Sequence, residues 1–186
     1  MDALVYIVST LLSLYMYVLL LRFIMQLVRA NFRNPLAQAI LSGGFGSGEI
    51  VKLSNPIILP LRRILPPAGR LDTASVVAIA LYALLSAALL WSLRYGLDLL
   101  SPLNLLQTAF YEILRSTLWI YFVAIFVYAL LSFIAPGTSS PTNDFLYSIC
   151  EPILTPIRRV IPPIAGLDLS VLWALIAIQA LLILLR

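Results

Sequence analysis

Four long stretches without a charged residue constrain this chain more than any other feature. They cover residues 3–21, 73–93, 116–135 and 169–185, and the first continues past Arg22 as apolar sequence to Val28. The hydrocarbon core of a bilayer is about 30 Å thick, so a helix needs roughly 20 predominantly apolar residues to cross it. We therefore predict an all-α membrane protein with four transmembrane helices, at about residues 3–28, 73–93, 116–135 and 168–185.

The composition excludes several classes of function. Charged residues make up 11% of the chain, whereas soluble domains are about 25% charged. There is no histidine and one cysteine, Cys150, which removes the usual metal clusters, disulfide frameworks and histidine-based catalytic dyads. Twelve basic residues against eight acidic ones are too scattered for a nucleic-acid interface. We expect a protein that is not an enzyme and has no catalytic residue, cofactor, metal site or nucleic-acid partner.

The chain contains an internal repeat. Residues 56–72 return as residues 152–168, shifted by 96 positions, with nine identities over seventeen aligned positions. Each copy holds four prolines and an arginine pair, which we call the proline–arginine motif: Pro56, Pro60, Pro66 and Pro67 with Arg62 and Arg63, and Pro152, Pro156, Pro162 and Pro163 with Arg158 and Arg159. We divide the chain into a first repeat at residues 1–95, a connecting interfacial segment at 96–115 and a second repeat at 116–186.

The distribution of basic residues predicts the orientation. Each repeat contains two crossings, so the second repeat begins on the same side as the first and both motifs face one side, as two tandem parallel hairpins. Eight basic residues lie on that side, namely Arg29, Arg33, Lys52, Arg62, Arg63, Arg70, Arg158 and Arg159. Three lie opposite, namely Arg94, Arg115 and Arg186. Because cytoplasmic loops are enriched in basic residues, we predict cytoplasmic motifs and external termini.

The repeated residues resemble the signature of the YggT family of small integral membrane proteins. The resemblance rests on residues 55–72 and on the fuller copy at residues 151–170, and it covers nearly the whole chain. It implies a multi-pass protein of the bacterial inner (plasma) membrane with a link to osmotic tolerance. In single-unit relatives it implies genes beside cell-division genes, and in plastid relatives membrane organisation and cytochrome assembly. It implies no defined biochemical activity. The arginine that the family carries late in the first helix matches Arg22, and the second repeat lacks one.

The motif itself predicts a short helix. Thr155 followed by Pro156 fits an N-cap and a first helical position, and two consecutive prolines end the helix. We expect one or two turns, lying in the interface or dipping into the membrane as a reentrant half-helix. Adjacent arginines point about 100° apart, so one of each pair can meet lipid phosphate while the other turns toward the bundle. Two interpretations stay open: the motifs form two sites for an anion or anionic headgroup, one per repeat, or the arginines are anchors without a specific ligand. The candidate contacts of these sites are Arg62, Arg63, Arg158 and Arg159.

Three further polar residues have predicted structural roles. Asp72 and Asp168 precede the second apolar window of each repeat, where a carboxylate caps the helix and can also pair with a motif arginine. Arg22 shares one helical face with Gln26, Arg29 and Arg33. It either snorkels to the interface or points into the bundle toward an acid, with Asp72 and Glu151 as the acids in reach.

For function, the sequence favours a structural or assembly factor that acts through lipids, membrane-protein partners or self-association. The alternative is a small channel or transporter for ion or osmotic balance, which needs polar residues at mid-membrane. The middle of the second and fourth windows offers almost no polar residue beyond Ser86 and Gln179, which counts against a transport path. The connecting segment, with Tyr111 and Glu112, reads as an amphipathic interfacial helix. Alanines in residues 73–93 favour close helix packing, and Cys150 reads as a small buried residue.

Overall fold

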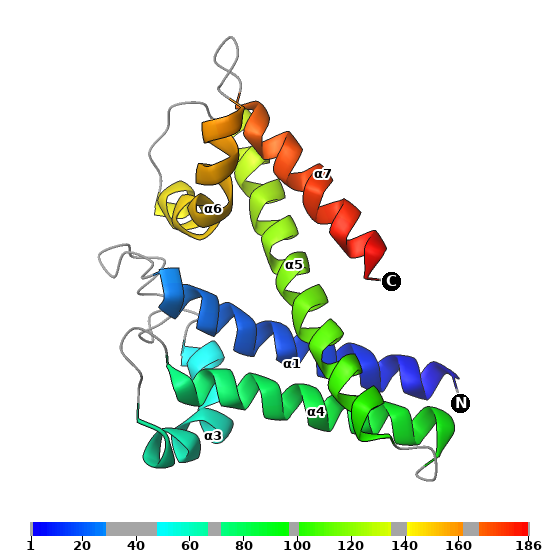
Figure 1. Cartoon of the computed structure of the whole chain (residues 1–186). Helices are drawn as coiled ribbons and strands as arrows, with labels where there is room; N and C mark the ends of the chain where they lie inside the picture. Colours follow the sequence, from blue (N-terminus) through cyan, green and yellow to red (C-terminus); the bar gives the residue numbers. More distant parts are fainter. Residues whose placement is uncertain are drawn as a thin grey trace. The chain divides into compact units, whose positions relative to one another are not determined.

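The computed structural model describes residues 2–28, 48–66, 72–96, 101–134, 141–161 and 168–185. Over these ranges the chain forms α1 (Asp2–Val28), α3 (Gly48–Ile64), α4 (Thr73–Tyr95), α5 (Pro102–Ile134), α6 (Pro141–Val160) and α7 (Leu169–Leu184), and no strand (Figure 1). The all-α class predicted from the apolar windows is therefore confirmed. Three of the helices, α1, α4 and α5, are long and apolar enough to cross a membrane.

The fourth apolar window forms a shorter helix than the other three. α7 is apolar but has 16 residues, which at about 1.5 Å per residue is roughly 24 Å. The hydrocarbon core is about 30 Å thick. Three helices of spanning length are thus shown among the described residues, and a fourth crossing through α7 stays a prediction.

The third window differs from the expectation in where its helix begins. α5 is one continuous helix of 33 residues that begins at Pro102, whereas the uncharged window begins at Ser116. Arg115 interrupts a run of uncharged residues but does not interrupt a helix, because arginine is a good helix former. Proline suits the first position of a helix, since its missing N–H has no intrahelical partner there. Residues 102–115 are therefore the first turns of α5 and not a separate helix.

The motif helices are longer than predicted. α3 has 17 residues and contains Pro56 and Pro60, and α6 has 20 residues and contains Pro152 and Pro156. The expected helix start at Pro156 is thus wrong. An internal proline removes one backbone hydrogen bond and crowds the preceding turn, so it bends a helix that packing holds together. In Figure 1 both α3 and α6 change direction along their length.

The ends of the motif helices lie where the consecutive prolines require. α3 ends at Ile64, two residues before Pro66, and α6 ends at Val160. The predicted stop is confirmed by these ends, because a residue that precedes proline is driven out of the helical conformation. Pro67, Pro162 and Pro163 themselves lie outside the described residues.

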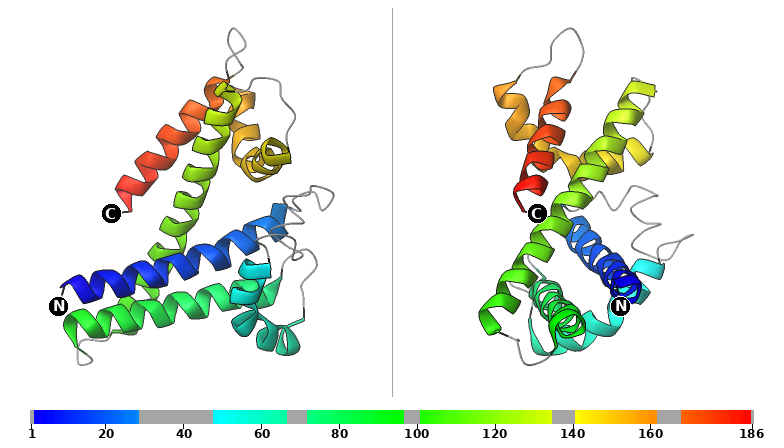
Figure 2. Two further views of the ribbon diagram at one scale, coloured as in Figure 1. Left: turned by 180° about the vertical axis from the view of Figure 1, so that it is seen from behind. Right: turned by 90° about the vertical axis from the view of Figure 1, so that its right-hand side faces the viewer.

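The chain divides into two compact units, and the first comprises residues 1–23 and 50–117. Within it α1 and α4 run side by side in opposite directions (Figures 1 and 2). The Tyr82 hydroxyl donates to the Leu12 carbonyl at 2.8 Å, and the Tyr15 and Tyr82 rings lie 5.0 Å apart. Small residues on α4 permit this approach, and those buried are Ala74, Ala78, Ala83 and Ala87. The burial of these alanines agrees with the predicted close packing.

The second unit comprises residues 24–49 and 118–186. Its core is formed by α5, α6 and α7 and consists of Ile125, Cys150, Leu154, Val171, Ala174, Ile178 and Leu182. Cys150 is fully buried, as expected of a small core residue. Burial raises the pKa of its thiol to about 12, so the reactive thiolate is absent at neutral pH.

Large apolar side chains cover the outside of the helices. Leu85 of α4, Phe133 of α5 and Leu184 of α7 are 70%, 80% and 80% exposed. A soluble protein avoids continuous apolar surface of this kind, whereas lipid chains solvate it without cost. The outer surface therefore supports a membrane environment for these helices.

Candidate functional site

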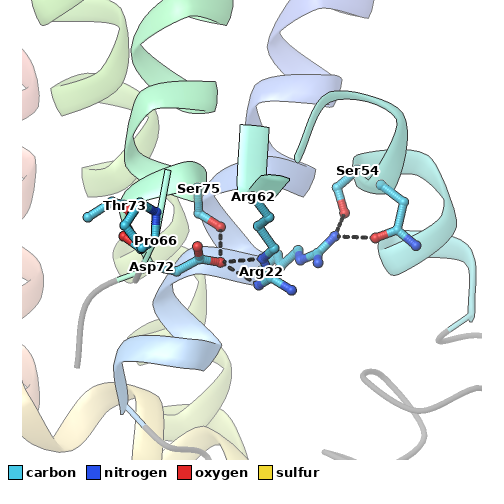
Figure 3. Close-up of polar contacts among 8 residues, drawn as sticks. Arg22, Ser54, Arg62, Pro66, Asp72, Thr73 and Ser75 are labelled. Atoms are coloured by element: carbon cyan, nitrogen blue, oxygen red, sulfur yellow. Dashed lines mark hydrogen bonds and ion pairs between the residues drawn. The ribbon is translucent and has the colours of Figure 1, made fainter. Parts of the chain in front are cut away.

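An ion pair joins each motif helix to the helix that follows it. In the first unit Arg62, near the end of α3, pairs with Asp72 just before α4 (Figure 3). In the second unit Arg158, near the end of α6, pairs with Asp168 just before α7, with distances to the same carboxylate oxygen of 2.8 Å from Nε and 2.6 Å from Nη2. The two ion pairs lie 96 positions apart, as the sequence repeat does. In both units an arginine–aspartate ion pair thus links the motif helix to the helix that follows it.

A serine hydroxyl near each aspartate donates a hydrogen bond to its carboxylate. The Asp168 carboxylate caps α7 by accepting from the Ser170 backbone N–H at 3.1 Å, and it also accepts from the Ser170 hydroxyl. Ala74 stands at the position equivalent to Ser170, and the Asp72 carboxylate instead accepts from the Ser75 hydroxyl at 2.7 Å. The first unit adds a hydrogen bond from the Thr73 hydroxyl to the Pro66 carbonyl at 2.8 Å (Figure 3).

These contacts keep both aspartates ionised at neutral pH. Partial burial alone raises the pKa of Asp72, but hydrogen bonds from Arg62 and Ser75 outweigh it, and the net pKa lies below the ordinary value. Asp168 has a lowered pKa for the same reason, with Ser170 and Arg158 as donors. A lowered carboxyl pKa in the folded state means that the charged form stabilises the fold above the ordinary carboxyl pKa.

The second arginine of each motif takes no part in this ion pair. Arg63 and Arg159 are exposed, and each is followed by an exposed aliphatic residue, Ile64 at 75% and Val160 at 80%. This arrangement agrees with the separation of about 100° between adjacent helical side chains. An exposed guanidinium beside exposed aliphatic surface is typical of a helix at the membrane interface, where both lipid phosphates and acyl chains are within reach.

Arg22 points into the first unit. Its side chain is 4% exposed, and its Nη1 donates to Ser54 Oγ and, at 3.1 Å, to Asn55 Oδ1 of α3 (Figure 3). The snorkelling interpretation is therefore wrong, and the interior interpretation is correct with different hydrogen-bonding partners. Asp72 attracts the Arg22 guanidinium electrostatically, and Arg62 repels it.

The sequence also associates Gln26, Arg29, Arg33 and Glu151 with Arg22, and the structure places some of them. Gln26 is half-buried on α1, while Arg29 and Arg33 lie outside the described residues. Glu151, the other acid suggested as a partner, is exposed on α6 and accepts from the Tyr147 hydroxyl at 3.3 Å. Sequence reasoning missed Ser54, although its alignment with the buried Cys150 marks it as an interior position of α3.

Two tyrosines, Tyr128 and Tyr147, lie beside Arg158 of the ion pair in the second unit. The Arg158 guanidinium lies 5.8 Å from the centre of the Tyr147 ring, and the Tyr128 and Tyr147 rings are 6.2 Å apart. Burial lowers the pKa of Arg158, but Asp168 and Tyr128 outweigh it and the net pKa is raised. A cation over an aromatic face gains electrostatic attraction, so Arg158 is held more tightly than an arginine in an ion pair alone.

The helices and the paired arginines define the class: an all-helical membrane protein in which a proline-bent helix is tied to the next helix by an arginine–aspartate pair. The described residues contain no group of three or more histidine, cysteine or acidic side chains that holds a metal ion.

The chain belongs to the CCB3/YggT family, whose description matches residues 1–93 and 107–186. It is 38% identical over 182 residues to an uncharacterized protein of Pseudomonas aeruginosa, covering 96% of this chain and 85% of that one. It is 33% identical over 179 residues to an uncharacterized protein of Vibrio alginolyticus, covering 96% and 91%. It is 32% identical over 170 residues to the uncharacterized protein YggT of Escherichia coli K12, covering 91% and 82%. No solved structure matches the chain.

Proposed function

We propose that this protein is a non-enzymatic structural or assembly factor of the bacterial inner membrane that acts by binding anionic lipid or partner proteins. The two arginines of each motif have different surroundings, and this difference supports the proposal. Arg62 and Arg158 each pair with an aspartate before the next helix, whereas Arg63 and Arg159 are exposed and form no ion pair among the described residues. A guanidinium on a fixed helix binds phosphate through two parallel hydrogen bonds at low entropic cost.

The proposal includes four membrane crossings in two tandem hairpins, with both motifs in the cytoplasm and both termini outside. In this arrangement α7 crosses with the help of flanking residues, since short helices are accommodated by local bilayer thinning and by snorkelling side chains. A cytoplasmic position brings Arg63 and Arg159 to the leaflet surface that carries the negative potential of anionic lipids. The links to osmotic tolerance and cell division that the family resemblance implies belong to this proposal as its physiological setting.

A small channel or transporter for ion or osmotic balance is the second candidate. One observation favours it: the Ser86 hydroxyl of α4 lies 2.7 Å from a carboxylate oxygen of Glu112 of α5. Both residues belong to helices of membrane-spanning length, and acidic residues inside a membrane are typical of ion and proton pathways.

The lipid contact predicts a specific effect of the exposed arginines. Arg63→Gln with Arg159→Gln should lower the retention of phosphatidylglycerol by the purified protein about fivefold per site, because one basic residue at the membrane surface contributes about 1 kcal/mol. Native mass spectrometry of the protein released from detergent measures this retention. Arg94→Gln is the matched control, since it removes an exposed arginine at the end of α4 outside the motif. Equal retention in the double variant and the control would refute a lipid role for these arginines.

The orientation predicts a labelling pattern in intact cells. In a Cys150→Ser background, cysteines introduced at Ser47 and Ser139 should be protected from a membrane-impermeant thiol reagent, and one at Ser101 should react. The positive-inside rule is the physical reason, because basic loops are retained in the cytoplasm. Permeabilised cells, in which all three positions should react, provide the control. Reaction at Ser47 and Ser139 with protection at Ser101 would show the opposite orientation.

A further inference from the structure

Glu112 of α5 and Ser86 of α4 form a polar contact in the first unit. Ser86 Oγ lies 2.7 Å from Glu112 Oε2, and Ser86 is 2% exposed. The sequence predicts an interfacial position for Glu112, because Arg115 separates it from the uncharged window. Since residues 102–115 are part of α5, this carboxyl group is carried alongside α4 instead.

The depth of the contact follows from the position of Ser86 on α4. Ser86 lies thirteen residues after Thr73 and nine before Tyr95, which corresponds to roughly 20 Å and roughly 13 Å along the helix axis. α4 is long and apolar enough to cross a membrane. The hydrocarbon core is about 30 Å thick. The Ser86 hydroxyl and the Glu112 carboxyl group hydrogen-bonded to it therefore lie well inside this core. An ionised carboxylate at this depth is costly unless a cation pairs with it.

The groups around Glu112 supply no such cation. Among the described residues Glu112 has no basic partner within ion-pair distance, and Arg62 of this unit pairs with Asp72. Arg115 lies one turn further along α5 and forms no ion pair with Glu112. Two tyrosines lie on the neighbouring helices: Tyr82 of α4 donates its proton to the Leu12 carbonyl, and Tyr15 of α1 donates to the Leu53 carbonyl.

The hydrogen bonds at Ser86 indicate whether the Glu112 carboxyl group carries a proton. Ser86 Oγ has two oxygen neighbours at hydrogen-bonding distance, the Ala83 carbonyl at 3.0 Å and Glu112 Oε2 at 2.7 Å. A hydroxyl group has one proton and donates one hydrogen bond. Both contacts are satisfied when the carboxyl group carries a proton and donates to Ser86 Oγ, while Ser86 donates to the Ala83 carbonyl.

We propose that Glu112 is a proton-binding site inside the membrane, with its carboxyl group protonated at neutral pH and hydrogen-bonded to Ser86. The ligand of this site is a proton. The site rests on the α4–α5 contact alone, so it is independent of the lipid contact proposed for Arg63 and Arg159.

The test uses carbodiimides on the full chain in phospholipid vesicles at pH 7, with modified peptides identified by mass spectrometry. A protonated carboxyl group adds across a C=N bond of the carbodiimide, its proton passing to nitrogen, and the adduct rearranges to a stable N-acylurea. An ordinary carboxyl group keeps its proton in roughly one molecule in 500 at this pH. Hydrophobic dicyclohexylcarbodiimide should therefore label Glu112 at least about tenfold more than the exposed Glu151, and Glu112→Gln should abolish the labelled peptide.

Two controls separate the alternatives. Arg115→Gln should leave labelling of Glu112 unchanged, and labelling that appears only in this variant would overturn the proposal by showing an ionised Glu112 paired with Arg115. A water-soluble carbodiimide should label Glu151 and spare Glu112, and equal labelling would overturn the proposal by showing a solvated carboxylate. Infrared difference spectra of the parent protein against Glu112→Gln at pH 7 should show the carbonyl band of a protonated carboxyl group, and its absence would also overturn the proposal.

Discussion

Arg22→Leu should lower the free energy of unfolding by about 1–3 kcal/mol, one of the two largest effects expected in this protein. The guanidinium is buried and donates to Ser54 and Asn55. Leucine fills part of the volume but donates nothing, and a buried polar group left without its partner costs about 1–3 kcal/mol. The melting temperature of the detergent-solubilised protein, followed by circular dichroism, should fall by several degrees.

Two comparison variants test whether the loss of stability arises from the buried position of Arg22. Arg94→Leu removes an exposed arginine on α4 and should leave the melting temperature unchanged. Arg22→Lys keeps the charge but loses the fork of donors, so its melting temperature should lie between those of the parent and Arg22→Leu. Arg22→Leu and Ser54→Ala should be non-additive, because the residues are in contact. A melting temperature for Arg22→Leu equal to that of the parent would contradict the interior position of this arginine.

Asp168→Ala should destabilise the second unit by about 2 kcal/mol, through two losses at once. It removes the cap of α7, worth about 1 kcal/mol, and the charge-assisted hydrogen bonds with Arg158, reduced by partial exposure of the pair. Arg158→Ala should lose the second of these contributions and keep the first. The double variant should then have nearly the same stability as Asp168→Ala alone, because Asp168→Ala already removes the interaction with Arg158. Thermal melting of the four proteins measures the coupling.

The destabilisation should depend on pH in a defined direction. The folded-state pKa of Asp168 is lowered, so its stabilising effect is complete above the unfolded-state pKa of about 3.9 and is lost as the pH falls through the folded-state pKa. The difference in melting temperature between the parent and Asp168→Asn should therefore be constant from about pH 7 to pH 5 and shrink in stronger acid. Asp144→Asn, which alters an exposed aspartate of α6, should show no comparable difference. A gap that widens on acidification would contradict the assignment.

Local chemistry along the chain was sufficient for part of this structure. The uncharged windows predict helices α1, α4, α5 and α7 because an apolar stretch of this length has its backbone satisfied only as a helix in lipid. Consecutive prolines predict where the motif helices end, because proline constrains the residue before it. The angle between adjacent side chains predicts that Arg158 and Arg159 face different surroundings. Each of these inferences depends on residues a few positions apart.

The tertiary structure decided what depends on contacts between distant segments. Whether Pro152 and Pro156 begin a helix or bend one depends on the packing of Leu154 and Cys150 in the core, which no local rule contains. The burial of Arg22 depends on hydrogen bonds to α3, more than thirty residues away. The position of Glu112 depends on α5 continuing past Arg115 and meeting Ser86. The sequence by itself thus determined that the apolar windows become helices and where the motif helices stop. Packing between helices determined which polar side chains are inside, because burial depends on partners and not on single residues.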